Sequence, residues 1–282
     1  SDKSKEAGPQ EEHQKSDMQW NEAHLHSGGN STFGNTFFEN RGDGKFLEIS
    51  DKVSAETYWP WGLSVADLNA DGYQDIFVTA GMNYPFRYQT NTLLINDRGS
   101  RFRPAEFILG VEPRKNRETA RPWFDLDCSR TDQKSHRLCT GTSGLVQAWG
   151  AMGSRSSVVF DLDDDGDLDI VSNEFNGEPM VLISDLAQTS KNLNYLRIKL
   201  TGSRSNKGGI GAKVVIETAD GTYTQNMDGK SGYLSQSLKP LYFGLGNATE
   251  VTGITVHWPS GKSQTINAPR LNTLLEIVEP DK

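Results

Sequence analysis

Two nine-residue segments rich in aspartate constrain this chain more than any other feature of its sequence. Each has an oxygen-bearing side chain at positions 1, 3, 5 and 9 and a glycine at position 6; they are Asp67, Asn69, Asp71 and Asp75 in the first Asp loop, and Asp161, Asp163, Asp165 and Asp169 in the second. Alternate side chains of such a loop converge on one centre, and the glycine permits the sharp turn. A hard cation such as Ca²⁺ takes about six to eight oxygen ligands. The sequence therefore predicts two Ca²⁺ sites, with the residue at position 7, Tyr73 or Asp167, offering its backbone carbonyl.

The segments on either side of each loop are typical of strands. Short runs of β-branched and aromatic residues flank both loops, at 63–66, 76–79, 157–160 and 170–172. An EF-hand would need helices there and a glutamate at position 12, where this chain has Val78 or Ser172. Each loop is therefore predicted to join two strands. An ordinary Asp-rich turn without metal is the alternative.

The charge of the chain limits its partners. The formal net charge is −8, with 37 acidic and 29 basic residues, which argues against general nucleic-acid binding because phosphate contacts need clustered Lys and Arg. The sequence shows no long stretch with the apolar spacing of a helix. It also lacks an apolar run of about 18 residues, so no transmembrane segment is predicted. An all-β chain is expected.

The two cysteines point to an oxidising compartment. Cys128 and Cys139 lie 11 positions apart in a polar stretch. A structural zinc site needs about four ligands, and only His136 is close by, so a disulfide is favoured. A disulfide and Ca²⁺ sites together predict a secreted, cell-surface or periplasmic protein.

The chain divides into three parts by composition and residue pattern. Residues 1–30 are polar and are predicted to be a disordered or extended arm. Residues 31–190 repeat a pattern: the two Asp loops lie 94 positions apart, about two units of 47, a period typical of propeller blades. In residues 191–282 apolar and polar residues alternate, which predicts a separate small all-β domain. Leu196 and Ile198 are expected to face inward and Arg197 outward.

The Arg-Gly-Asp tripeptide and two Trp-Gly pairs are explained by local structure. Arg41-Gly42-Asp43 spells an integrin-binding tripeptide, but it lies where a Gly-Asp-Gly hairpin turn is needed, and the turn is favoured. Trp61 and Trp149 each precede a glycine and are predicted to pack between blades.

Four segments of the last part carry a resemblance to the ASPIC/UnbV domain: 206–214, 229–237, 241–246 and 256–261. The Asp loops, with Asn-rich and Gly-Asp-Gly segments between them, resemble FG-GAP/VCBS-type propeller repeats. Together these resemblances cover roughly residues 33–280 and point to the cartilage acidic protein-like family. They imply an extracellular Ca²⁺-binding interaction protein with no established enzymatic role.

A closed propeller has about four to eight blades, and residues 31–190 hold about three. We therefore expect a partial or incomplete propeller followed by a small β-sandwich or barrel-like domain. Exposed strand edges normally have to be covered, which predicts a subunit of a larger assembly, with other subunits or cell-surface proteins as partners.

Aromatic residues in one loop offer an alternative function. Tyr84, Phe86 and Tyr88 form a candidate binding surface, since exposed aromatics are enriched in interfaces. They would suit a carbohydrate-binding adhesion module that recognises glycans. An enzyme with a catalytic metal is a third hypothesis, but the sequence offers no nucleophile and base in a recognisable motif, so no enzyme is predicted.

Overall fold

The computed structural model describes residues 35–57, 59–81 and 88–281. The predicted arm at 1–30 and the candidate residues Tyr84 and Phe86 lie outside this part of the chain. The described residues fold almost entirely into strands, as predicted, and none of the sheets closes into a barrel. No helix in the described ranges has the length and apolar character needed to cross a membrane.

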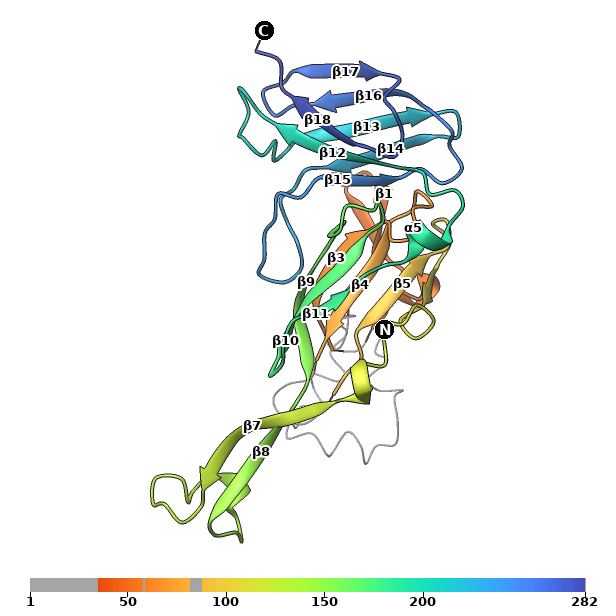
Figure 1. The fold of residues 1–282 in the computed structure, drawn as a ribbon. Coiled ribbons are helices and arrows are strands. Elements are labelled where there is room, and N and C mark those ends of the chain that lie inside the picture. Colours follow the sequence, from red (N-terminus) through yellow and green to blue (C-terminus); the bar gives the residue numbers. More distant parts are fainter. Residues whose placement is uncertain (1–34, 58, 82–87, 282) are drawn as a thin grey trace.

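The elements fall into an N-terminal repeat region and a C-terminal sandwich (Figure 1). The repeat region contains β1 (Phe38–Gly42), β2 (Lys45–Glu48), α4 (Ser50–Val53), β3 (Pro60–Ala66), β4 (Asp75–Ala80), β5 (Thr92–Asn96), β6 (Phe102–Pro104), η1 (Lys115–Arg117), β7 (Ala120–Asp127), η2 (Arg137–Cys139), β8 (Leu145–Ala151), β9 (Gly153–Phe160), β10 (Asp169–Phe175), β11 (Met180–Leu182) and α5 (Leu186–Thr189). The C-terminal sandwich contains β12 (Tyr195–Thr201), β13 (Lys213–Thr218), β14 (Thr222–Asn226), β15 (Leu241–Gly244), β16 (Val251–His257), β17 (Ser263–Asn267) and β18 (Leu274–Val278).

Two antiparallel sheets form the body of the repeat region. The first has the strand order β3-β4-β5-β6 and the second β11-β10-β9. The β1–β2 hairpin turns at Asp43 and Gly44, which confirms the turn expected at the Arg-Gly-Asp tripeptide. The four-stranded meander has the form of a blade, but the described sheets make no closed ring, so the propeller remains a prediction.

The two body sheets meet where β3 lies against β9. Ser64 Oγ lies 3.1 Å from Ser157 O and 2.8 Å from Ser157 Oγ. A Cβ added to Gly62 would lie 2.6 Å from Arg155 O, so only small side chains fit on this face of β3. The small residues of β3 therefore face β9 in the interface. Trp61 lies on the opposite face of β3 and is 40% exposed. Trp61 is therefore not buried in the core as predicted, although its ring contacts Arg155 of β9, whose guanidinium lies 4.4 Å from the ring centroid.

Strands β7 and β8 form a separate two-stranded arm at the end of the molecule away from the C-terminal sandwich (Figure 1). The disulfide between Cys128 and Cys139 closes the loop at its tip, as predicted. Trp149 lies on β8 and is 57% exposed. It too was expected in the core, but β7 and β8 form a two-stranded sheet of their own, and more than half of Trp149 is exposed.

The C-terminal sandwich consists of two facing sheets, with strand orders β15-β12-β18 and β14-β13-β16-β17. The side chains between them form one apolar core. Leu196 and Ile198 are fully buried in it, and Val256 and Trp258 enter it from the other sheet. This confirms the predicted alternation and the sandwich.

Candidate metal centre

Both Asp loops form the same backbone frame. The first joins β3 to β4 and the second joins β9 to β10, as predicted from their flanks. The position-6 glycines, Gly72 and Gly166, have φ of +94° and +102°, a conformation that other residues resist. Each glycine N–H donates to Oδ2 of the aspartate at position 1, at 2.8 Å in the first loop and 3.0 Å in the second.

The aspartate at position 9 anchors each loop to its sheet. In the first loop Asp75 accepts hydrogen bonds from Leu68 N at 2.9 Å and from Asn96 N at 2.8 Å. In the second, Asp169 accepts from Leu162 N and Ser184 N, both at 2.8 Å. Position 9 therefore serves the local fold in both loops, whether or not it also binds metal.

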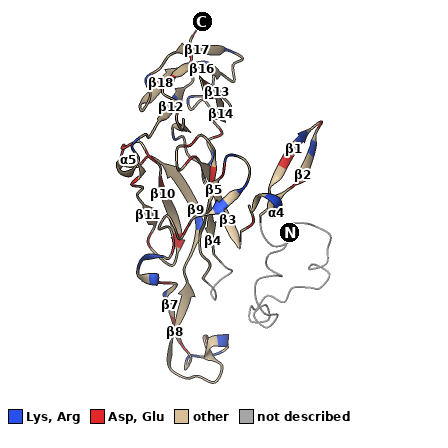
Figure 2. Ribbon diagram, turned by 90° about the vertical axis from the view of Figure 1, so that its right-hand side faces the viewer, with Lys and Arg blue, Asp and Glu red and all other residues tan. Residues whose placement is uncertain are grey.

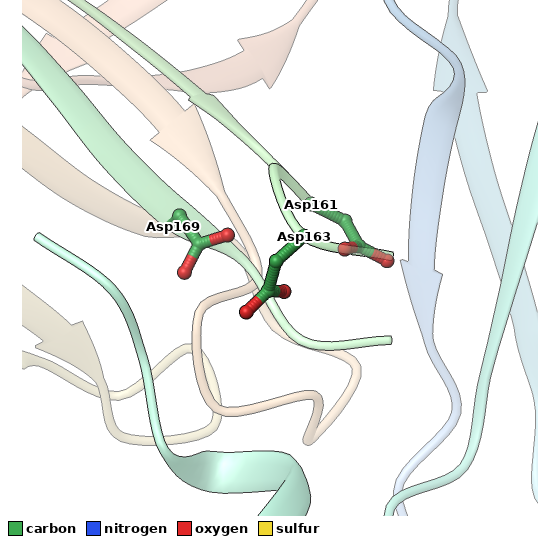
Figure 3. Close-up of side chains that lie close together, drawn as sticks. All are labelled: Asp161, Asp163 and Asp169. Atoms are coloured by element: carbon green, nitrogen blue, oxygen red, sulfur yellow. The ribbon is translucent and has the colours of Figure 1, made fainter. Parts of the chain in front are cut away.

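The second loop brings three carboxylates together. Asp161, Asp163 and Asp169 each place a ligand atom so that all three lie within 4.8 Å of one another (Figure 3). In the described part of the chain, this is the one such group of three acidic, histidine or cysteine side chains. Three like charges at this separation repel unless a cation lies between them.

Two buried oxygens of this loop have no hydrogen-bond partner among the described residues: Asp161 Oδ1 and Asp167 Oδ1. A buried acceptor that is left unsatisfied costs about 1–3 kcal/mol, and more for a charged group. The Asp161 side chain is only 2% exposed, so bulk water does not relieve it. If Asp161 Oδ1 were a ligand of a hard cation, the cation would satisfy it.

Arg197, on β12, lies against the same loop. Its Nη1 lies 2.6 Å from Asp161 Oδ2 and 2.9 Å from Asp164 Oδ1. Alternation along β12 predicts that Arg197 faces away from the sandwich core, and it does, but the second Asp loop covers that face and leaves only 14% of the side chain exposed. The guanidinium therefore supplies part of the positive charge that the acidic loop requires. Sequence reasoning missed this contact, which joins residues far apart in the chain.

The first loop satisfies its own carboxylates. Asn69 Nδ2 donates to Asp71 Oδ2 at 3.1 Å, and Asp71 N lies 3.1 Å from Asp67 Oδ1. Asp71 Oδ1 accepts from Tyr73 N at 2.9 Å. With an amide at position 3 as a donor, the loop closes by hydrogen bonds alone.

Burial shifts the acidity of these groups. Burial raises the pKa of Asp67 to about 7, although the hydrogen bond from Gly72 opposes the shift. Burial likewise raises the pKa of Asp75 to about 6, against hydrogen bonds from Asn96 and Leu68. In the second loop, burial raises the pKa of Asp161, and Arg197 opposes it. Burial therefore opposes ionisation in both loops, and the hydrogen bonds of the first loop do not fully offset it at Asp67.

The remaining predicted ligands have other contacts. Asp165 accepts from Asp167 N at 3.1 Å and from Gln188 Nε2, on α5, at 2.6 Å, and it lies outside the group of three. The Asp167 side chain is buried, with Oδ2 accepting from Ala187 N at 2.7 Å. Tyr73 has an exposed side chain.

The donor set of the second loop fits Ca²⁺. It consists of oxygen atoms, one of them buried and unsatisfied, and hard cations prefer oxygen ligands. Asp161, Asp163 and Asp169 would hold the ion. The first loop offers the oxygens of Asp67, Asn69 and Asp71, but it would first have to give up hydrogen bonds among them.

Both loops pack against the C-terminal sandwich. Gly246 N donates to Ala70 O of the first loop at 2.9 Å, and Tyr242 Oη donates to Gly166 O of the second at 3.0 Å. A Cβ on Gly244 would lie 2.1 Å from Asp67 Oδ2. The loops are therefore part of the boundary between the two halves of the protein.

The candidate aromatic surface is only partly described. Tyr88 is half-buried, and its hydroxyl donates to Glu112 Oε2 at 2.6 Å and accepts from Arg114 Nε at 3.0 Å. The hydroxyl of Tyr88 is therefore engaged inside the protein rather than offered to a ligand.

Comparison with known proteins bears on both halves of the chain. Residues 202–282 match the family model for ASPIC and UnbV, and residues 25–78 match that for an FG-GAP-like repeat. This confirms the predicted resemblance. The match to the FG-GAP-like repeat contains the first Asp loop and ends before the second.

The curated relatives are cartilage acidic proteins. The chain is 28% identical to cartilage acidic protein 1 of Xenopus tropicalis and 29% identical to that of Homo sapiens, each over 279 residues. These alignments cover 87% of this chain but only 41% and 40% of the relatives. The chain thus spans about two fifths of the length of the relatives it matches.

Proposed function

We propose that this protein is an extracellular, Ca²⁺-binding protein-interaction module that works as a subunit of a larger assembly. The observation that carries the proposal is the convergence of Asp161, Asp163 and Asp169 within 4.8 Å, next to the unsatisfied Asp161 Oδ1. Ca²⁺ bound there would neutralise the repulsion between the carboxylates. The proposal assigns no catalytic activity.

Two observations support an extracellular location. The Cys128–Cys139 disulfide persists in oxidising compartments and is rare in the cytosol. The matching relatives are named for cartilage and for their acidity, and this chain is acidic as well, with a net charge of −8.

Exposed apolar side chains support a role in assembly. On β3, Trp61, Leu63 and Val65 alternate along one face and are 40%, 53% and 50% exposed. The β1–β2 hairpin, which stands away from the body sheets (Figure 2), exposes Phe38 and Phe46. Contiguous exposed apolar surface is characteristic of protein contact sites, and such surfaces fit a partner that continues the repeat region.

Thermal unfolding with and without Ca²⁺ tests the proposal. Ligand at about 100 times its dissociation constant stabilises a protein by about 2.7 kcal/mol, which corresponds to a rise in Tm of roughly 5–10 °C for a chain of this size. We expect that rise when Ca²⁺ replaces EDTA, with a smaller effect of Mg²⁺, which demands stricter octahedral geometry. Identical transitions in Ca²⁺ and EDTA would rule the proposal out.

A further inference from the structure

A cavity of about 230 Å³ lies between the repeat region and the C-terminal sandwich. Apolar side chains make up much of its wall, among them Val65, Leu168, Met227 and Leu241. It is smaller than a pocket for a drug-sized ligand, which has a volume of roughly 300–1,000 Å³. A cavity of this size fits a small organic molecule or one side chain of a partner protein.

The polar side of the cavity contains Lys239, a half-buried amine. Lys239 belongs to the long loop between β14 and β15, which extends from the sandwich toward β9 (Figure 1). Its ammonium donates to the backbone carbonyl of Val159, and no described carboxylate forms an ion pair with it. Burial lowers the pKa of Lys239, and the charge of Asp228 opposes this only in part.

Two further groups in the same wall lack partners. Arg197 Nε and Ser237 Oγ are buried and have no hydrogen-bond partner among the described residues, and both residues line the cavity. The acidic residues of the wall are largely engaged: Asp161 and Asp164 bind Arg197 Nη1, and Asp228 Oδ1 accepts from Lys230 N at 3.0 Å. The wall therefore contains an amine without a described ion-pair partner and two unsatisfied donor groups, beside the unsatisfied acceptor Asp161 Oδ1.

We propose that this cavity binds a small carboxylate whose charged end pairs with Lys239 and whose apolar body contacts Leu168 and Leu241. A buried cation without an anion is unfavourable, and a bound carboxylate removes that cost. Ser237 and Arg197 line the same cavity and would be further donors to the ligand. This cavity borders the second Asp loop through Asp161 and Arg197, but its charged partner for the ligand is Lys239 rather than Ca²⁺, so binding can be tested in EDTA.

Isothermal titration calorimetry with matched acids and amides tests the site. Butyrate and benzoate are titrated into the full chain at fixed ionic strength in chloride, once in EDTA and once in Ca²⁺, beside butyramide and benzamide. We expect saturable binding of the acids in both buffers, and at least tenfold weaker binding of the amides. Equal binding of acids and amides would overturn the proposal, as would no binding of either.

Variants locate the binding to Lys239. K239M removes the charge and keeps the length of the side chain, so we expect at least a tenfold loss of butyrate affinity. The control K213Q removes an exposed lysine on β13 outside the cavity and should bind as the wild type does. If K239M does not fold, S237A gives the second test, with an expected loss of a few-fold. Unchanged affinity in the variant that folds would contradict the proposal.

Two sources of the carboxylate can be separated by a third probe. N-acetyl-L-glutamic acid α-amide presents only the side-chain carboxylate, as a residue in a protein would, and the corresponding glutamine derivative is its neutral control. Tighter binding of this probe than of butyrate identifies the acidic side chain of a partner protein, and the reverse order identifies a free small acid. A crystal structure in excess butyrate that contains only water in the cavity would refute both.

Discussion

The first and second Asp loops share their spacing, their glycine and their anchoring at position 9, yet the partners of their carboxylates differ. In the first, Asn69 donates to Asp71, and Asp71 N reaches Asp67, so the protein supplies the donors. In the second, Asp163 cannot donate, three carboxylates converge within 4.8 Å, and Asp161 Oδ1 has no partner. The two loops differ in the backbone donor to the aspartate at position 1 and in the residue at position 3, where an amide donates in the first loop and a carboxylate joins the acidic group in the second.

This difference shows that a match to the motif does not by itself establish a metal site. The family match to an FG-GAP-like repeat contains the first loop, whereas the convergent carboxylates belong to the second. Sequence spacing fixes where the backbone turns. The hydrogen-bond partners of each carboxylate decide how strongly a cation is needed.

The largest expected effect comes from removing the carboxylate at position 3 of the second loop. Asp163 is exposed, so D163N should leave the Ca²⁺-free fold intact. We expect Ca²⁺ affinity to fall on the order of 100-fold, because substitution even of groups outside the ligand shell costs about 10–100-fold. Competition with a fluorescent chelator measures it. D43N, in the β1–β2 turn, removes the same charge elsewhere and should keep wild-type affinity; an equal loss in both variants would contradict the site.

Converting the first loop to the pattern of the second should give the next largest effect. N69D replaces a donor with a carboxylate, and affinity at such sites rises with the number of charged ligands. We expect about tenfold tighter Ca²⁺ binding by the first loop and a lower Tm in EDTA. N40D, the same change in the β1 strand, serves as the control. If N69D binds no more tightly than the wild type, position 3 does not explain the difference between the loops.

Removing Arg197 should have a smaller effect on Ca²⁺ binding. In R197Q the second loop loses the guanidinium that lies 2.6 Å from Asp161, so Ca²⁺ no longer competes with it for this carboxylate. We expect a few-fold rise in Ca²⁺ affinity, together with destabilisation by about 3–5 kcal/mol in EDTA because a mostly buried ion pair is broken. Denaturant unfolding in EDTA and in Ca²⁺ measures both; equal destabilisation in the two buffers would show that Ca²⁺ does not replace the arginine.

Glu279 provides a carboxylate for which no response to Ca²⁺ is expected. It is buried, and its Oε2 accepts from the backbone N–H groups of 203, 204 and 205 at 2.7–2.9 Å. Burial alone would raise the pKa of Glu279, but hydrogen bonds from Ser260, Ser205 and Arg204 prevail and lower it to about 2 from 4.5. E279Q should lower the Tm equally in EDTA and Ca²⁺, since protein donors already satisfy this group.

The pH dependence of that variant has a definite sign. A carboxylate with a lowered pKa in the folded state contributes stability above its unfolded pKa and loses it as pH falls toward the folded one. The Tm gap between wild type and E279Q should therefore be full above pH 4.5 and close as pH falls toward about 2. Thermal scans across this range measure the gap, and a gap that widens on acidification would contradict the assignment.

Local features of this fold were predictable from sequence. The positive φ of Gly72 and Gly166, the strands flanking both loops, the disulfide and the alternation of Leu196 and Ile198 all follow from short-range chemistry. They depend on neighbours in the chain, and the sequence displays those neighbours directly.

Features that depend on distant contacts were not predictable. Arg197 faces away from its own core, as alternation requires, but only the fold reveals that the second Asp loop covers that face. Trp61 was expected in the core, but the close approach of β9 admits only small residues such as Gly62 there. The convergence of Asp161, Asp163 and Asp169 was expected from their spacing, but the same spacing does not reveal that the first loop pairs its side chains with one another.

A crystal structure determined with excess Ca²⁺ tests the central claim most directly. We predict an ion bound by Asp161, Asp163 and Asp169 at about 2.3–2.6 Å from their oxygens, with Asp161 Oδ1 among its ligands and higher occupancy than at the first loop. A second Asp loop that keeps Arg197 on Asp161 and contains only water between its carboxylates under those conditions would contradict the account.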